Sequence, residues 1–195
     1  MPKDKNFDLY CSVAEHMFDN MESPIEKAFC GAFLLELLDI NNIAREIECE
    51  EDAFFVEPRK INICAQYVVD DKYRVDFCVT VNPFSDIDIY DHLRKREKNQ
   101  RVPFIFDVCK PFKIFVELDG HEFHEKTKEQ VDYRNERDAY LQNFGFVYHI
   151  SGRQITSDCK KTVQGFFDFI QEVGNKVFME RRKIWRSVLQ TQKNF

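Results

Sequence analysis

The sequence has no apolar run long enough to cross a membrane, and residues 1–10 alternate charged and apolar side chains instead of forming a signal-peptide core. Its seven cysteines include no CxxC and no other short paired spacing, which argues against a zinc ribbon and a disulfide framework. With 6 glycines and 6 prolines in 195 residues, it also lacks the composition of a disordered or fibrous chain. These absences predict a cytoplasmic globular protein with reduced thiols and no membrane partner.

The residues that are present fit one domain with an aromatic-rich core. Hydrophobic residues make up 44% of the chain, charged residues 32%, and there are 20 phenylalanines. A chain of 195 residues is long enough for one full core and short for two. We expect a single domain over residues 1–195, with its core at about 23–174, an N-terminal arm at 1–22 and a C-terminal helix at about 175–195.

The net charge of −6 is unfavourable for a nucleic-acid partner, because phosphate binding depends mainly on lysine and arginine. The basic residues nevertheless gather in runs at 94–101, 160–161 and 181–183. The first run lies in a polar excursion at residues 82–111, and each run alone is more typical of a solvated face or loop. Any nucleic-acid contact therefore has to come from local basic patches.

Capping signals and hydrophobic spacing predict a helix followed by a hairpin. Ser23 and Glu26 have the spacing of a capping box with a proline at the first helical position, so a helix should run from there to about residue 39. Two β-rich runs, Ile61–Val69 and Tyr73–Val81, are separated by three polar residues and predict an antiparallel hairpin.

The second half of the chain predicts a strand, a helix and a strand. An apolar strand at 112–118 is followed by a helical pattern at 127–144 and by a short apolar strand at 146–150. Such a unit normally leaves its two strands parallel, so we expect a mixed sheet with helices on its faces. Helical patterns return at 157–172 and, as a second piece, at 176–190.

Three acidic side chains stand where the strands predict burial. Glu117 and Asp119 are two residues apart at the end of an apolar strand, so both carboxylates should lie on the same side of the sheet. Asp76 shows the same anomaly within a β-rich run. Buried charge is costly unless it is paired, and a hard divalent cation is one good partner. The pattern predicts a metal ion shared by these acids, although a salt bridge to Arg74 or to a lysine would explain each acid alone.

Two histidines follow the acidic strand end directly. His121 and His124 form an HxxH without further Cys or His nearby, which is a weak zinc signal, and the arrangement is not that of metalloproteases. At the mouth of a site with two acids, His124 can orient the attacking water or donate to a phosphate. His121 fits a surface or capping position equally well.

Two arginines lie in the helical pattern at 127–144. Arg134 and Arg137 either pair along an exposed helix face with Asp132 and Glu136 or contact phosphate, and the sequence leaves both interpretations open. The residues of this helix with the character of a core are Val131, Tyr140 and Leu141.

The residues from 116 onward read VELDGHEFHEKT and continue as KEQVDYRNERDAYLQNFGFVYHISGRQI. An acidic strand end, Gly-x-x-aromatic-His, a helix with arginine and aspartate that ends in Leu-x-x-x-Gly, and a following strand together resemble the very-short-patch-repair-endonuclease-like nucleases of the PD-(D/E)xK superfamily. The resemblance is close over about residues 116–155, with weaker support at 23–26 and 75–77. It implies a restriction-endonuclease-like fold, an α/β/α sandwich with a central mixed β-sheet flanked by helices.

The resemblance also implies a metal centre. Asp76 matches the principal metal ligand and Glu117 the second acid, while Leu118 is expected to offer its backbone carbonyl. Asp119 stands where the superfamily has a lysine or the repair enzyme its first histidine, and is expected to assist the metal or the water. The implied catalytic residues are Glu26, Asp76, Glu117, Asp119 and His124, and the implied metal ligands are Asp76, Glu117, the Leu118 carbonyl and Asp119.

The departure at Asp119 removes a positive group near the nucleophile, so Lys126, Lys128 or a second metal is expected to replace it. The nucleic-acid contacts expected in this region are His121, Lys126, Lys128, Arg134, Arg137 and Arg153.

These observations predict a metal-dependent endonuclease that hydrolyses phosphodiester bonds in DNA through a Mg²⁺-activated water, with Mn²⁺ as a substitute. The alternative is a nuclease-fold module that binds nucleic acid or a protein partner without catalysis. The missing lysine and the negative charge favour the alternative, whereas the cluster of desolvated acids disfavours it. With one site per chain, cutting both strands needs a homodimer or two encounters, and the sequence leaves both open.

Overall fold

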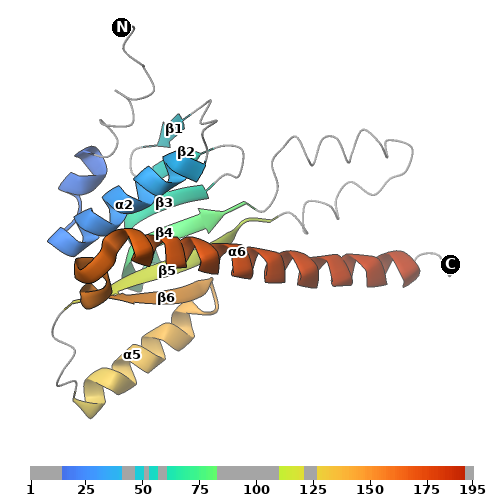
Figure 1. Cartoon of the computed structure of the whole chain (residues 1–195). Coiled ribbons are helices and arrows are strands. Elements are labelled where there is room, and N and C mark those ends of the chain that lie inside the picture. Colours follow the sequence, from blue (N-terminus) through green and yellow to red (C-terminus); the bar gives the residue numbers. More distant parts are fainter. Residues whose placement is uncertain are drawn as a thin grey trace, which may run out of the picture.

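The chain forms a mixed β-sheet with helices on both faces (Figure 1). The computed structural model describes residues 15–40, 47–50, 53–56, 61–82, 110–120 and 127–191. Within these ranges the sheet has six strands in the order β1-β2-β3-β4-β5-β6. The α/β class and the mixed sheet expected from the sequence are therefore confirmed.

Four of the strands in the described ranges, from residue 61 onward, follow the sequence patterns closely, whereas the first two were not predicted. They are β1 (Ile47–Glu50), β2 (Ala53–Val56), β3 (Ile61–Val69), β4 (Tyr73–Val81), β5 (Phe112–Asp119) and β6 (Phe146–Ser151). Neighbours from β1 to β5 pair antiparallel, and β5 pairs parallel with β6. The hairpin of β3 and β4 has the predicted bounds, and its turn places Asp70 and Asp71 at φ of 52° and 51°, a conformation that aspartate tolerates.

Within the described residues, three long helices pack on the sheet. They are α2 (Pro24–Ile40), α5 (Lys128–Leu141) and α6 (Gly152–Thr191). The predicted division of the last helix at residues 173–175 is wrong, because α6 continues through them. The helix is interrupted instead at Asp158, which has an extended φ of −159° and accepts the Lys161 N–H at 3.0 Å, as an N-cap residue does.

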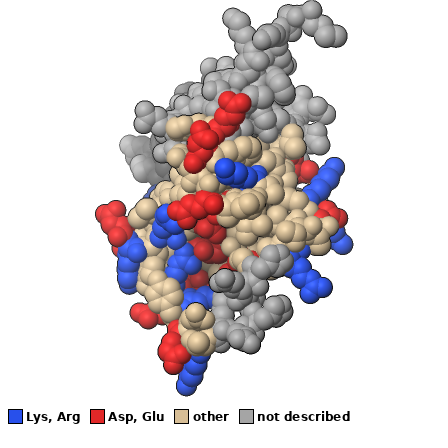
Figure 2. Space-filling view, turned by 90° about the vertical axis from the view of Figure 1, so that its left-hand side faces the viewer, with Lys and Arg blue, Asp and Glu red and all other residues tan. Residues whose placement is uncertain are grey.

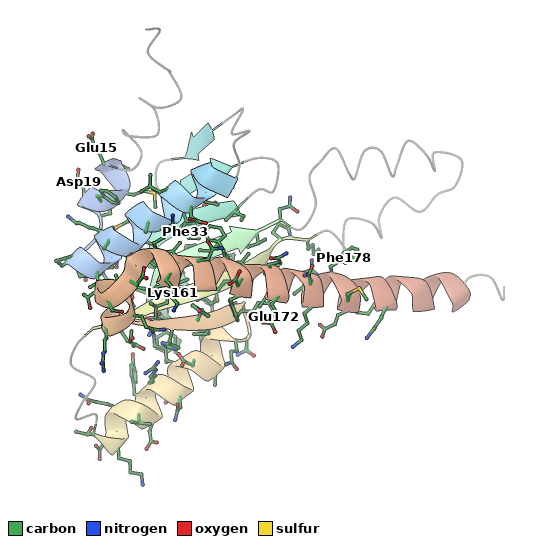
Figure 3. The ribbon with its side chains drawn as sticks, viewed as in Figure 1. Glu15, Asp19, Phe33, Lys161, Glu172 and Phe178 are labelled. Atoms are coloured by element: carbon green, nitrogen blue, oxygen red, sulfur yellow. The ribbon has the colours of Figure 1, made fainter. Side chains whose placement is uncertain are left out.

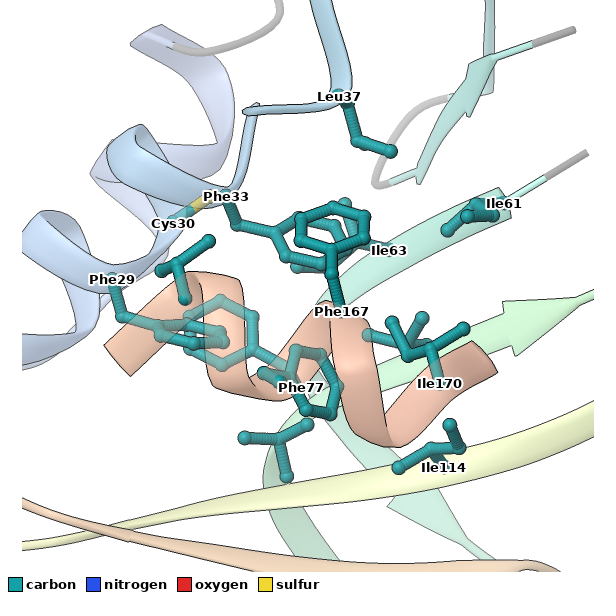
Figure 4. Packing of buried hydrophobic residues seen from close by; sticks show 14 of the residues in the cluster. Phe29, Cys30, Phe33, Leu37, Ile61, Ile63, Phe77, Ile114, Phe167 and Ile170 are labelled. Carbon is teal, nitrogen blue, oxygen red and sulfur yellow. The ribbon is translucent and has the colours of Figure 1, made fainter. Parts of the chain in front are cut away.

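The larger core lies between the sheet and the two helices α2 and α6, which pack on each other. Its centre is aromatic: Phe33 of α2 stacks on Phe167 of α6 with ring centroids 4.8 Å apart, and Phe29 lies 5.4 Å from Phe77 of β4 (Figure 4). These phenylalanines therefore fix α2 against both the sheet and α6.

A smaller core lies on the opposite face, beneath α5. Leu141 of α5 packs there with Val69, Val75, Cys78 and Phe115 of the sheet. Helices thus bury apolar side chains on both faces, and the sheet is the middle layer (Figure 1).

The long helix α6 runs past the ends of the strands. Figure 3 shows Phe178 near the point where the helix leaves the sheet. Beyond this point the exposed apolar side chains include Met179 and Ile184. None of the helices in the described ranges combines the length and apolar character that a membrane crossing requires.

The hairpin of β3 and β4 changes face halfway along its length. Ile63 and Phe77 point into the larger core, whereas Val69 and Val75 point into the smaller one, although strict alternation would put all four on one face. The change falls at Gln66, whose backbone is left-handed with φ of 51°. β3 and β4 pair in the same register before and after Gln66. In this register Gln66 stands opposite Asp76.

Candidate active site

The candidate site lies where β4 and β5 stop pairing. Their ladder ends at Phe77 and Val116, so the next residues in this register are Asp76 and Glu117. In place of a main-chain bond, Asp76 Oδ2 accepts the Leu118 N–H at 2.6 Å. The two strands are neighbours, as the hypothesis of a shared ion requires, and their acids stand at the same level.

Glu117 is buried and bound to an arginine from α5. The residue is 9% exposed, and Arg137 donates from Nη2 to its Oε1 at 2.5 Å. The same Arg137 nitrogen donates to the Arg74 carbonyl at 2.6 Å. Burial raises the pKa of Glu117 to about 7, with a further contribution from Asp76, because the attraction of Arg137 offsets only part of the lost hydration.

Asp76 is also held in a state that favours protonation. Burial raises the pKa of its carboxyl, the hydrogen bond from Leu118 opposes this, and the nearby Glu26 raises the pKa further. Its main partner is therefore a backbone N–H and not Arg74, which pairs with Glu22 at 2.8 Å instead.

Glu26 comes to this site from the first turn of α2. Its side chain accepts the Glu22 N–H at 3.1 Å, the Ser23 hydroxyl at 2.6 Å and the Gln66 side-chain amide at 2.8 Å. One half of the predicted capping box is present, since Ser23 Oγ accepts the Glu26 N–H at 3.3 Å, whereas the Glu26 side chain accepts the N–H of Glu22 in place of that of Ser23. Glu26 therefore serves as a helix cap and stands close enough to Asp76 to influence its pKa.

Gln66 belongs to this cluster and was not predicted. It stands opposite Asp76, binds Glu26 through its nitrogen, and its Oε1 is buried without a hydrogen-bond partner among the described residues. In the sequence it looks like an ordinary outward residue of an alternating strand, and no local pattern marks its left-handed backbone. A buried acceptor beside three acids is available to a ligand's donor group.

A second ionic cluster surrounds Asp119. Arg134 donates to Asp119 Oδ2 at 2.8 Å, and His149 Nδ1 lies 3.3 Å from the same oxygen. His149 Nε2 lies 2.9 Å from Asp138 Oδ2, so the ring stands between two carboxylates. Burial lowers the pKa of His149, but its bonds to Asp119 and Asp138 outweigh burial and the net shift is upward.

The inner face of α5 is charged instead of apolar. Arg134, Arg137, Asp138 and Leu141 have the spacing of one helical face and point toward the sheet. Neither open interpretation of the arginines described this, because Arg134 and Arg137 pair with acids at the end of β5. Arg134 Nε also lies 4.0 Å from Asp138 Oδ2, one turn along the helix. The prediction of Val131 as core was wrong, since it is 41% exposed.

His149 is the functional candidate that the sequence prediction missed. In the parallel register of β5 and β6 it stands directly opposite Glu117. The predicted strand pairing and a lone histidine in the apolar run FVYHI were available signals. Aligning the two predicted strands in parallel would have placed His149 beside Glu117.

The remaining predicted residues are placed less centrally. Lys128 and Arg153 are exposed, at the starts of α5 and α6. Leu118 lies between the two acids of β5, and its N–H is bound to Asp76. His121, His124 and Lys126 lie outside the described residues.

Figure 2 shows the face of the molecule on which this site opens. Acidic side chains gather near the centre of the face, and basic side chains lie directly beside them. The ion pairs of Arg134 with Asp119 and of Arg137 with Glu117 likewise bring basic and acidic side chains together at this site.

The oxygen donors at this site fit a magnesium ion only if the present ion pairs rearrange. Within the described ranges, no group of three or more His, Cys, Asp or Glu side chains is arranged as a metal site. Asp76 and Glu117 are two oxygen donors at one level, and Mg²⁺ commonly uses one or two carboxylates and completes its shell with waters and substrate phosphates. The fit requires Arg137 to release Glu117, and Asp119 is directed toward Arg134 and His149 instead.

The described part of the chain is thus an α/β protein whose mixed sheet ends in a half-buried cluster of acids and arginines. Comparison with family models, with curated proteins and with solved structures finds no match to this chain. Its side chains and their geometry therefore carry the functional inference.

Proposed function

We propose that this protein is a metal-dependent endonuclease that hydrolyses phosphodiester bonds in DNA, on a restriction-endonuclease-like fold. The observation that carries the proposal is the meeting of Asp76 and Glu117 at the diverging ends of β4 and β5. Both acids are buried enough for their pKa values to be raised, so a cation that replaces their lost hydration would stabilise them strongly. The resemblance over residues 116–155 points to Glu117, and its weaker part at residues 75–77 points to Asp76.

Asp76 and Glu117 would hold Mg²⁺, with the Leu118 carbonyl as a further donor. When bound, the ion would supply an activated water and neutralise phosphate charge. Glu26, fixed by its three hydrogen bonds, supports Asp76 from the side of α2. His124 is proposed to orient the water or to donate to the phosphate.

The arginines of α5 would replace the lysine that the superfamily motif carries on the strand. Arg137 is already within hydrogen-bond distance of Glu117, and Arg134 of Asp119. With Glu117 serving as a metal ligand, the Arg137 guanidinium would be available to a phosphate group beside it and would stabilise negative charge there. This arrangement supports catalysis without a lysine at position 119.

The test is cleavage of supercoiled plasmid, single-stranded DNA and RNA by the wild type and by Asp76→Asn and Glu117→Gln, with Mg²⁺, Mn²⁺ or EDTA. We expect divalent-dependent cutting that falls at least about 100-fold in either variant, the size of a lost ligand or transition-state contact. Glu136→Gln is the matched control, because Glu136 is an exposed acid on the outer side of α5. Wild-type rates in folded Asp76→Asn would remove the proposal.

A second candidate function is a nuclease-fold module that binds nucleic acid or a protein partner without catalysis. One observation favours it: Glu117 and Asp119 already have arginine partners, so their burial has a structural explanation without a metal. Melting in the presence of Mg²⁺ separates the two. A rise in melting temperature that Asp76→Asn abolishes supports the enzyme, and its absence supports the module.

A further inference from the structure

Four aromatic side chains lie in a row beside the candidate site, and we call them the aromatic track. Tyr73 of β4 has its ring centroid 6.4 Å from that of Tyr133 and 5.3 Å from that of Tyr140, both in α5. Phe144, just after α5, lies 5.4 Å from Tyr140. The track therefore joins the start of β4 to the part of α5 from Tyr133 to its C-terminal end.

The two outer members of the track are largely open to solvent. Tyr133 is 58% exposed and Phe144 is 44% exposed, whereas Tyr73 and Tyr140 are half-buried beneath them. The half-buried rings hold the exposed rings in place, so the exposed ones are presented in a defined orientation. Rigid, exposed aromatic rings in a contiguous group are typical of interaction surfaces.

Two cations accompany the rings and connect them with the acids. Lys72 Nζ lies 4.9 Å from the Tyr73 ring and 4.1 Å from the Tyr140 ring. The Arg137 guanidinium lies 6.0 Å from the Tyr73 ring and is hydrogen-bonded to Glu117. The aromatic track is thus continuous with the candidate active site through Arg137.

We propose that the aromatic track binds single-stranded nucleic acid, whose unpaired bases stack on Tyr133 and Phe144 while Lys72 and Arg137 contact the backbone. Unpaired bases offer their faces to aromatic rings, whereas the bases of a duplex are already stacked on each other. The net charge of −6 also leaves few cations for a duplex backbone, so stacking has to supply much of the affinity. This inference rests on the proposed function in naming the strand as substrate.

The direct test is the affinity of the full chain for a short labelled single-stranded DNA, measured by fluorescence anisotropy in EDTA so that no cutting occurs. We expect Tyr133→Ala and Phe144→Ala each to weaken binding about 5- to 100-fold, the loss that follows removal of one base–aromatic stack. Val131→Ala is the matched control, because this residue is also exposed on α5 and lies outside the track. Equal melting temperatures of the variants establish that all of them are folded.

Three further probes separate stacking from charge. A strand of the same length with abasic positions keeps the phosphates and should bind at least about 10-fold more weakly, and the corresponding duplex should do so too. The logarithm of affinity should fall with the logarithm of salt concentration with a slope of about 0.7, the contribution of Lys72, because without a metal ion the charge of Arg137 stays compensated by Glu117. The affinity for RNA of the same sequence should be within about threefold of the affinity for DNA, since base stacking does not depend on the sugar.

Abasic strands that bind as tightly as intact ones, or unchanged affinity in both Tyr133→Ala and Phe144→Ala, would overturn the inference. Binding only to duplex, or to no nucleic acid at all, would overturn it as well and leave a protein partner as the occupant of these rings. The cleavage test is independent of these results. Binding that depends on stacking but is not followed by cutting would contradict the proposed endonuclease activity and support the aromatic track as a binding site. Cutting at an unchanged rate in Tyr133→Ala would support the endonuclease activity and contradict the role of the aromatic track.

Discussion

At the scale of single residues, Glu117 and Arg137 form the ion pair on which the site depends. Their side chains are 12% and 18% exposed, so both charges have lost most of their hydration. A buried pair of this kind adds little net stability, but removal of one partner leaves the other uncompensated. The pKa of Glu117 of about 7 indicates that its carboxyl can take a proton when its compensation weakens.

We predict that Arg137→Gln lowers the free energy of unfolding by about 3 kcal/mol at neutral pH, because Glu117 is left without its guanidinium. Glu117→Gln should cost less than about 1 kcal/mol, because the glutamine oxygen can still accept from Arg137, whose nitrogen also keeps the Arg74 carbonyl as an acceptor. The double variant should then recover most of the loss caused by Arg137→Gln. Urea unfolding of the four proteins measures this cycle, and additive losses would show that the two side chains are not coupled.

At the scale of elements, the strands from β3 onward were predictable because they are runs of apolar and β-branched residues bounded by polar turns. β3, β4 and β5 lie where the apolar runs predicted them, and the capping box located the start of α2. The face change at Gln66 was not predictable, because one left-handed residue alters the alternation without altering its composition. Gln66 stands opposite Asp76, the residue next to the end of the β4–β5 ladder.

The helix α5 shows why part of the site escaped prediction. Its inward residues are charged, so a search for an apolar stripe chose Val131, which is exposed, and assigned Arg134 and Arg137 to the surface. The acids of β5 were found because charge in an apolar strand is anomalous. Their arginine partners lie on a helix, where charged residues are common on the exposed face and give no signal in the sequence. Only the tertiary structure shows which face of the helix points toward the sheet.

The turn after α5 gives a stability prediction for this element. A Cβ at Gly145 would lie 2.6 Å from the Lys113 carbonyl oxygen and 3.0 Å from the Phe115 ring, so Gly145→Ala must displace the start of β6 from β5. We expect a loss of about 1–3 kcal/mol in the free energy of unfolding. Gly165→Ala is the control within α6, where a Cβ meets nothing within 4 Å, and it should stabilise the protein by about 0.5–1 kcal/mol. Equal effects of the two substitutions in thermal unfolding would contradict this account.

At the scale of the whole molecule, several buried groups share one response to pH. The pKa values of Asp76 and Glu117 are raised by burial, and that of His149 is raised by its two carboxylate partners. All three groups therefore bind protons more tightly in the folded than in the unfolded state. Because stability falls with rising pH wherever the folded state holds more protons, the three contributions have the same sign.

We predict that without divalent ions the free energy of unfolding falls as pH rises from about 4.5, where Glu117 begins to ionise in the unfolded chain, to about 7, by roughly 3 kcal/mol from Glu117 alone. The contribution of His149 continues this fall above its ordinary pKa. Glu117→Gln should flatten the lower part of the profile and His149→Gln the upper part. Millimolar Mg²⁺ competes with these protons, so its stabilisation of the wild type should grow with pH and vanish in Asp76→Asn. The measurement is urea unfolding along this pH series. A free energy of unfolding that rises from acid to neutral pH in the wild type would mean that these acids are hydrated. A stabilisation by magnesium that is independent of pH would mean that the ion binds elsewhere.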